Sequence, residues 1–190
     1  MALFTFFGGK NAAFSEPALD LYRTAVTAAR AAPFYAVLGV PDTPDGRFDM
    51  IALHVFLALR RIKRAGSGQA LAVAQALTDQ MFADLDRNLR ELGVGDLGVG
   101  RQVKALAAAF MGRIAAYDAA LDHAGNGDLT AALGRNIFRA DPDGAPARAA
   151  TAALAAYVRT ADDALAAQAI EAILSGRVSF PSPPAAERIE

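Results

Sequence analysis

The stretch RFDMIALHVFLALRRIKR (residues 47–64) decides the fold. Its apolar side chains recur at three- and four-residue spacing, the period of one face of an α-helix. This stripe comprises Phe48, Ile51, Val55, Leu59 and Ile62, and it is widened by Met50, Leu53 and Leu57. A helix that is apolar over so much of its surface has to be covered by other elements. The stretch therefore predicts a buried central helix.

The residues on either side of this helix contain boundary signals. The preceding loop, VPDTPDG (residues 40–46), contains two prolines and two aspartates, which favour turns, and Asp45 is the expected N-cap. Basic residues crowd the other end, where they complement the negative end of the helix dipole. They are Arg60, Arg61, Lys63 and Arg64. Gly66-Ser67-Gly68 then ends the helix.

Helical periodicity continues along the rest of the chain. Further helices are predicted over about residues 17–31, 69–92, 99–122, 128–138 and 147–174, with a short helical turn at 34–38 and a kink near 160–163. The helix 69–92 has an apolar stripe of Leu71, Ala74, Met81, Leu85, Leu89 and Leu92. No stretch alternates with period two, so no sheet is expected.

These signals predict an all-α fold, a single-domain bundle of six to seven helices. Residues 1–15 are expected to form an irregular arm, residues 16–175 the helical domain, and residues 176–190 a proline-containing tail that is largely unpacked.

Composition excludes several classes of function. The chain of 190 residues has no cysteine, two histidines and a formal net charge of −1, which argues against thiolate chemistry, iron–sulfur ligation and a general affinity for nucleic acid. No apolar run approaches the about 18 residues of a membrane span. The first ten residues lack a basic region of the kind that begins a signal peptide, so we expect a cytoplasmic protein.

The chain contains no recognisable catalytic constellation. GVGDLG (residues 93–98) matches a dinucleotide-binding fingerprint, but a helix precedes it where that site needs a strand, so it is interpreted as a helix–loop–helix connector. Asp42, Asp45 and Asp49 lack the spacing of a calcium loop. His54 lies among apolar residues and is interpreted as a hydrogen-bonded core residue. We predict no catalytic residue, no metal and no cofactor.

Three segments resemble the ubiquinol–cytochrome c chaperone family. They are FYAVLGVPDTPDGRFDMIALH (residues 34–54), MFADLDRNLRELGVGD (residues 81–96), and the run from Val103-Lys104 through Phe110–Arg113 to Tyr117. They occur in the family's order, and the resemblance covers about residues 21–173. It implies a helical, non-enzymatic chaperone that binds newly made cytochrome b and promotes assembly of the bc1 complex.

The resemblance also suggests partners and a location. Mitochondrial members act with a small partner near the ribosomal exit, so a small assembly partner and the ribosome are further candidates. The absence of an arginine- and serine-rich presequence makes this chain similar to bacterial relatives, acting at the cytoplasmic face of the inner membrane. The competing function is a helical binder of a lipid, quinone or haem, and an unrecognised enzyme ranks below both.

Charged residues at one end of the bundle are the candidate client or partner site. They are Asp42, Arg47, Arg87, Arg90, Glu91, Asp96, Lys104 and Arg113. Spacing of four predicts ion pairs Asp86–Arg90 and Arg87–Glu91, so the alternative is internal pairing that only fixes the connector. Phe4, Phe6 and Phe7 in the arm are candidates for membrane contact, the alternative being that they pack onto the bundle.

Overall fold

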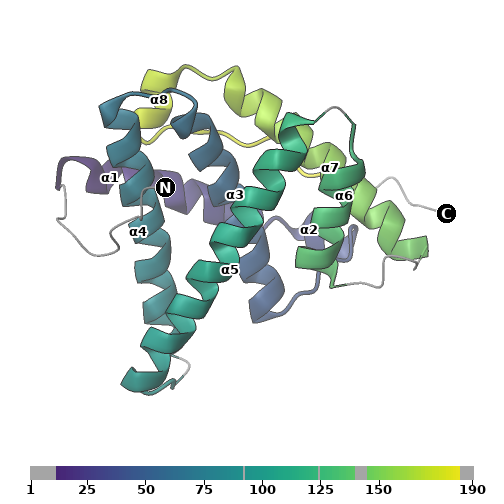
Figure 1. The fold of residues 1–190 in the computed structure, drawn as a ribbon, viewed down its shortest axis with the longest axis horizontal. Helices are drawn as coiled ribbons and strands as arrows, with labels where there is room; N and C mark the ends of the chain where they lie inside the picture. Colours follow the sequence, from purple (N-terminus) through teal and green to yellow (C-terminus); the bar gives the residue numbers. More distant parts are fainter. Residues whose placement is uncertain (1–11, 92, 124, 140–144, 185–190) are drawn as a thin grey trace.

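The computed structural model describes residues 12–91, 93–123, 125–139 and 145–184. Within these ranges every regular element is helical (Figure 1). The elements are α1 (Ala12–Ala29), α2 (Ala32–Ala36), α3 (Pro44–Lys63), α4 (Gly68–Glu91), α5 (Asp96–Asp122), α6 (Gly127–Leu133), the π-helix η1 (Gly134–Phe138), α7 (Ala145–Ala166) and α8 (Ile170–Leu174). The predicted all-α class is confirmed. No helix in the described ranges combines the length and apolar character needed to cross a bilayer.

Helix α3 is the central helix, as predicted. Thirteen of its twenty residues are buried. It begins earlier than expected, and its N-cap is Thr43, whose hydroxyl accepts a hydrogen bond from the Gly46 amide at 3.2 Å. The prediction of Asp45 as the cap is therefore wrong, because Pro44 occupies the first helical position and places Asp45 inside the first turn. Gly46 faces the Pro41 carbonyl so closely that a Cβ would overlap it.

Two hydrophobic clusters lie on either side of α3. One joins α3 to α2, the C-terminal half of α5, α6, η1 and α7, with Phe34, Phe56 and Tyr117 among its largest members. The other joins α3 to α1, α4, α8 and Phe110 of α5. Since α3 contributes to both clusters, it ties the two halves into one bundle.

Helix α1 begins five residues before the expected start. Residues 12–15, assigned to the irregular arm, are helical, and Phe14 is half-buried against the cluster shared by α1, α3 and α4. Pro17 lies inside this helix, where it donates no backbone hydrogen bond. The predicted boundary at residue 15 is therefore wrong for these four residues, and the rest of the arm lies outside the described residues.

Helix α4 confirms part of the predicted stripe, since Ala74 and Met81 are buried and Leu85 packs half-buried against the cluster shared with α1 and α3. The buried residues are Ala70, Val73, Ala74, Leu77, Thr78, Met81 and Phe82. Leu71 is 61% exposed, so its assignment to the core is wrong. The buried face of α4 packs against α1 and α3.

Helices α4 and α5 run side by side and meet at the lower tip of the molecule in Figure 1. The connector between them is shorter than predicted, because α5 begins at Asp96, with Gly95 as its N-cap. A helix thus precedes the glycine motif and a second helix follows it, which confirms its interpretation as a helix–loop–helix connector.

The C-terminal third departs most from prediction. α7 runs through residues 160–163 without a break and ends at Ala166, so the predicted kink is wrong. Arg61 of α3 donates to the carbonyls of Leu165 and Gln168 at 3.0 and 2.9 Å, which satisfies this helix end. A separate short helix, α8, follows.

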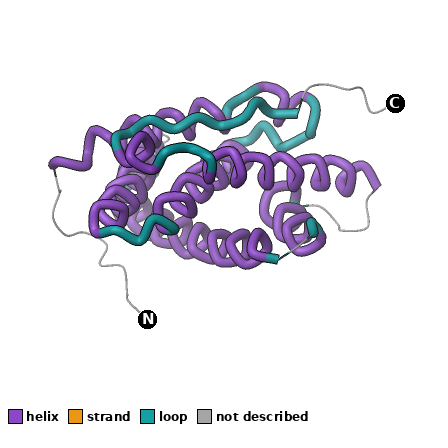
Figure 2. Tube along the Cα trace, turned by 90° about the horizontal axis from the view of Figure 1, so that it is seen from above, coloured by secondary structure: helices purple, strands orange, loops and turns teal. Residues whose placement is uncertain are grey.

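The tail is packed as far as Phe180, which contradicts the predicted unpacked tail. Val178 and Phe180 are half-buried against both hydrophobic clusters. The side chain of Gln168 accepts from the Ser179 amide at 2.9 Å and donates to its carbonyl at 2.8 Å. Figure 2 shows this segment as a long loop lying along the helices. Its prolines suit an extended chain fixed by neighbours.

Candidate functional site

The predicted site residues fall into two groups. Arg87, Arg90 and Glu91 lie in the last turns of α4, Asp96 begins α5, and Lys104 is exposed two turns further on. Asp42, Arg47 and Arg113 lie near the start of α3 instead. From Asp96 to Arg113 the path along α5 is about 25 Å. The structure therefore does not gather all eight residues into one rim.

Ion pairs fix the tip of the α4–α5 hairpin. Arg90 contacts Asp86 at 2.6 Å, as the spacing predicts, and it also pairs with Asp96 across the connector. Arg87 pairs with Asp84, so the predicted Arg87–Glu91 pair is replaced. Tyr22 of α1 donates to the same Asp84 carboxylate at 2.8 Å, and burial raises the pKa of this tyrosine. The tip is thus tied to α1.

The second group surrounds the start of α3. Arg47 contacts Asp42 at 2.6 Å in an exposed pair, and this hydrogen bond lowers the pKa of the Asp42 carboxyl. Arg113 reaches from α5 to Asp49 at 2.9 Å, with its guanidinium 5.7 Å from the centre of the Phe48 ring. Arg113 therefore links α5 to α3, and its guanidinium is engaged in the interior of the bundle.

Asp49 is the most deeply buried acid of this cluster. It is 2% exposed, and besides Arg113 it contacts Arg139 at 3.0 Å. Burial raises its pKa to about 6, and the two arginines oppose this shift only in part. Arg139 adopts a left-handed backbone with φ of 46° directly after η1. The π-helix and this strained residue together bring Arg139 to Asp49.

Sequence reasoning missed the partners of Asp49. Its place in a predicted buried helix was the available signal, because a buried carboxylate requires a cation or several hydrogen-bond donors. Arg113 was selected for its charge and not for this contact. Arg139 lies 90 residues away from Asp49, so helix periodicity gave no means of pairing them.

Arg60 forms a second long-range ion cluster. Its side chain is 3% exposed and pairs with Asp118 and Asp122 of α5 and with Asp162 of α7, the last two at 2.6 and 3.2 Å. Arg60 lies in the last turn of α3, as the sequence predicts, but its contacts reach further than the helix end. It joins α3, α5 and α7, and its hydrogen bond lowers the pKa of Asp122.

His54 is a core residue, as predicted. Its Nδ1 lies 2.8 Å from the Met50 carbonyl oxygen and its Nε2 lies 2.9 Å from the Tyr157 hydroxyl. Complete burial lowers its pKa to about 4, so it is neutral at physiological pH. Phe34 and Phe180 pack edge-on against the ring. These contacts join α2, α3, α7 and the tail.

The described clusters hold helices together. In the described ranges no three histidine or acidic side chains are grouped to hold a metal ion. The Asp42–Asp45–Asp49 set is divided among arginine contacts. Phe4, Phe6 and Phe7 lie outside the described residues, so their membrane contact stays a prediction.

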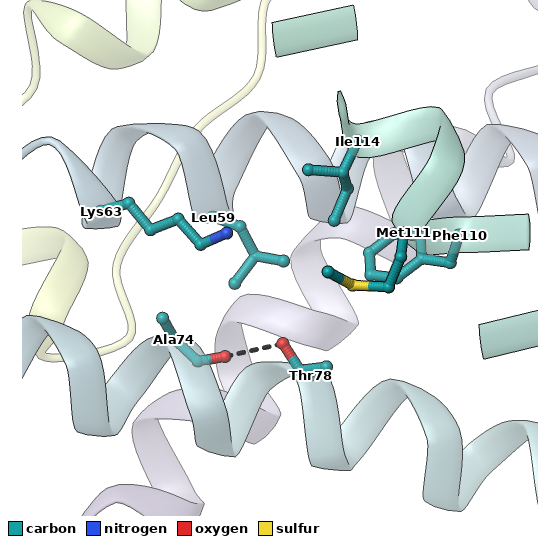
Figure 3. A pocket seen from close by; sticks show the side chains of 7 residues that line it. All are labelled: Leu59, Lys63, Ala74, Thr78, Phe110, Met111 and Ile114. Carbon is teal, nitrogen blue, oxygen red and sulfur yellow. Dashed lines mark hydrogen bonds between the residues drawn. The ribbon is translucent and has the colours of Figure 1, made fainter. Parts of the chain in front are cut away.

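A small apolar slot lies between α3, α4 and α5 (Figure 3). Its cavity is about 20 Å³. The lining side chains are Leu59, Lys63, Ala74, Thr78, Phe110, Met111 and Ile114. The Thr78 hydroxyl donates to the Ala74 carbonyl at 2.8 Å, so it is already satisfied. The slot consequently presents apolar surface with one cation beside it.

Comparison with known proteins adds two findings. A family model described as "Ubiquinol-cytochrome C chaperone" matches residues 36–180. The crystal structure of a Cbp3 homolog from Brucella abortus superimposes with a TM-score of 0.79 and 42% sequence identity, covering 90% of this chain and 92% of that one. No curated protein matches.

Proposed function

The chain belongs to the ubiquinol–cytochrome c chaperone family, and from this premise we propose that it binds newly made cytochrome b and promotes assembly of the bc1 complex. The family match is the observation that carries the proposal. It runs from α2 to Phe180 of the packed tail, so it includes the central helix and most of both hydrophobic clusters. The 42% identity to the Brucella Cbp3 homolog over nearly the whole of both chains supports the same function.

The proposed mechanism is holding and release without catalysis. Before its helices associate, a multi-span client exposes apolar surface that would otherwise aggregate. A chaperone that binds the immature form more tightly than the assembled form shifts the client population by that difference in affinity alone. Its site of action would be the cytoplasmic face of the inner membrane, where cytochrome b is inserted.

The slot between α3, α4 and α5 gives no support to the competing function. Its 20 Å³ is far below the roughly 300–1,000 Å³ typical of pockets for drug-sized ligands. A quinone or haem does not fit there without rearrangement of the three helices. Mass spectrometry of the purified protein for a retained small molecule tests the competing function directly.

Deletion of the gene tests the proposed function. We expect selective loss of bc1, measured as ubiquinol–cytochrome c reductase activity and as the haem b absorbance of membranes. Activity of an oxidase that takes electrons directly from quinol serves as the control, and the wild-type gene should restore bc1. Normal bc1 levels in the deletion strain would reject the proposal.

A further inference from the structure

The large exposed apolar residues of the described chain flank one site. They are Leu71, 61% exposed, and Met111, 40% exposed. Met111 lines the slot between α3, α4 and α5, as Figure 3 shows. Leu71 lies one turn before Ala74 and two turns before Thr78, on the α4 face that lines the same slot. The slot therefore continues outward into apolar surface on both sides.

The outer face of α5 extends this surface. Between Lys104 and Asp122, each exposed residue of α5 is alanine, glycine or methionine. Of the charged side chains in this interval, Arg113 contacts Asp49, and Asp118 pairs with Arg60 while its side chain stays 50% exposed. The uncharged face from Ala105 to Ala119 is about 21 Å long.

Gly112 lies in this face, and no contact within the bundle requires a glycine there. A Cβ added there would meet nothing within 4 Å, and the residue is mid-helix, where glycine is less favourable than alanine. Removal of side chains from an exposed helix face allows another backbone to approach closely.

The surface suits a helix and not an extended chain. The described residues form no strand and so offer no free sheet edge, and an extended peptide buried here would leave its backbone groups unpaired. A helix satisfies its own backbone. Lys104 is exposed two turns before Met111 on the same side of α5, and it favours a helix with a carboxylate or its negative dipole end at this rim.

We propose that an apolar α-helix of the membrane-embedded client docks lengthwise along the outer face of α5, with its apolar side chains against Met111 and Leu71. This inference rests on the proposed function and assigns a surface to it. The docked helix covers apolar surface of the client that would otherwise meet water.

Single-cysteine crosslinking tests the location, because the chain contains no cysteine. Met111→Cys and Leu71→Cys, with Ala152→Cys on the exposed side of α7 as control, are each labelled with a benzophenone maleimide. Each is then added to cytochrome b made by cell-free translation with inner-membrane vesicles. We expect cytochrome b adducts at residues 111 and 71 to exceed those at 152 at least fivefold.

The outcomes separate the two proposals. Cytochrome b that co-isolates with the chaperone but crosslinks at 152 as well as at 111 would overturn the docking surface alone. If cytochrome b does not co-isolate with the chaperone in any experiment, the proposed function is overturned as well.

A substitution gives a second test. Gly112→Leu extends into open space, so its melting temperature should equal or exceed that of the wild type, while capture of cytochrome b falls at least fivefold. Ala152→Leu adds similar bulk away from the surface and should capture normally. A folded Gly112→Leu variant with undiminished capture would refute the docking surface.

Discussion

Arg60 joins α3, α5 and α7 through its ion pairs. Its partner Asp162 is also largely buried, and removal of one member of a buried pair leaves an uncompensated charge. We predict that Arg60→Met lowers the free energy of unfolding by about 2–4 kcal/mol. Urea unfolding followed by circular dichroism at pH 7.5 measures it.

Arg64 provides the matched control. It contacts the same Asp122 and Asp162, but its side chain is 47% exposed. Arg64→Met should therefore lower the free energy of unfolding by less than about 1 kcal/mol. Equal losses for the two variants would mean that burial of Arg60 has no energetic consequence.

The hairpin tip offers a test of the predicted charged rim. Arg90→Glu breaks exposed pairs with Asp86 and Asp96, and Lys104→Glu reverses an exposed charge, so each should change stability by less than about 1 kcal/mol. We predict that both variants fold and assemble less bc1, measured by reductase activity. Arg23→Glu on exposed α1 is the control. Wild-type assembly in both tip variants would place the rim elsewhere.

Local and long-range contacts differ in how well sequence predicts them. Asp86–Arg90 follows from helix spacing, so it was predicted. Arg60 and Asp49 have partners 58–102 residues away, and only the packing of α3 against α5, η1 and α7 brings these together. The predicted list consequently contained Arg113 but not Asp49, Arg139 or Arg60.

At the scale of elements, the start of α3 depends on Thr43. Thr43→Ala removes the cap and should lower stability by about 1 kcal/mol, while Thr43→Ser keeps the hydroxyl and most of the stability. Thermal unfolding measures both. If Asp45→Ala proved more damaging than Thr43→Ala, the cap assignment would be wrong.

The packed tail gives a second prediction at this scale. Phe180 lies 5.1 Å from His54, ring centre to ring centre, and contacts both hydrophobic clusters. Phe180→Ala should lower the free energy of unfolding by about 1–3 kcal/mol, because half-buried aromatic surface is lost. Ser182→Ala, at an exposed position, should change little. Equal stability of the two variants would indicate that the tail is not packed in solution.

Helix identity followed from periodicity, whereas helix ends and the tail did not. The stripe of α3 indicated burial because it covers most of the helix circumference. The tail prediction relied on its prolines, yet Val178, Phe180 and the pairing of Gln168 with Ser179 decide its position. A short extended segment has no period that would reveal such contacts.

At the scale of the whole molecule, two buried groups respond oppositely to pH. The pKa of His54 falls to about 4 from an ordinary value of 6.5, so its contribution to stability is complete above pH 6.5 and is lost toward pH 4. The pKa of Asp49 rises to about 6 from 3.8, so its protonation favours the folded state increasingly as pH falls from 6 to 3.8. Between pH 6 and 4 these two contributions oppose each other.

Asp49→Asn should reveal how His54 alone makes the stability depend on pH. Without the opposing carboxylate, stability should fall on acidification from pH 6 to 4 more steeply than in the wild type, by up to about 1.4 kcal/mol per pH unit. Urea unfolding at half-unit steps measures the two slopes, and the other carboxyls are common to both proteins. Parallel slopes would contradict the opposing contributions.

The central claim is that this chain holds cytochrome b before bc1 is complete, and pulse-labelling tests it most directly. Cells carrying the affinity-tagged protein are labelled briefly, chased, and the protein is isolated at intervals. We predict that labelled cytochrome b co-isolates at the earliest times and leaves as labelled bc1 appears. Absence of labelled cytochrome b from every isolate, or its presence only within mature bc1, would contradict the account.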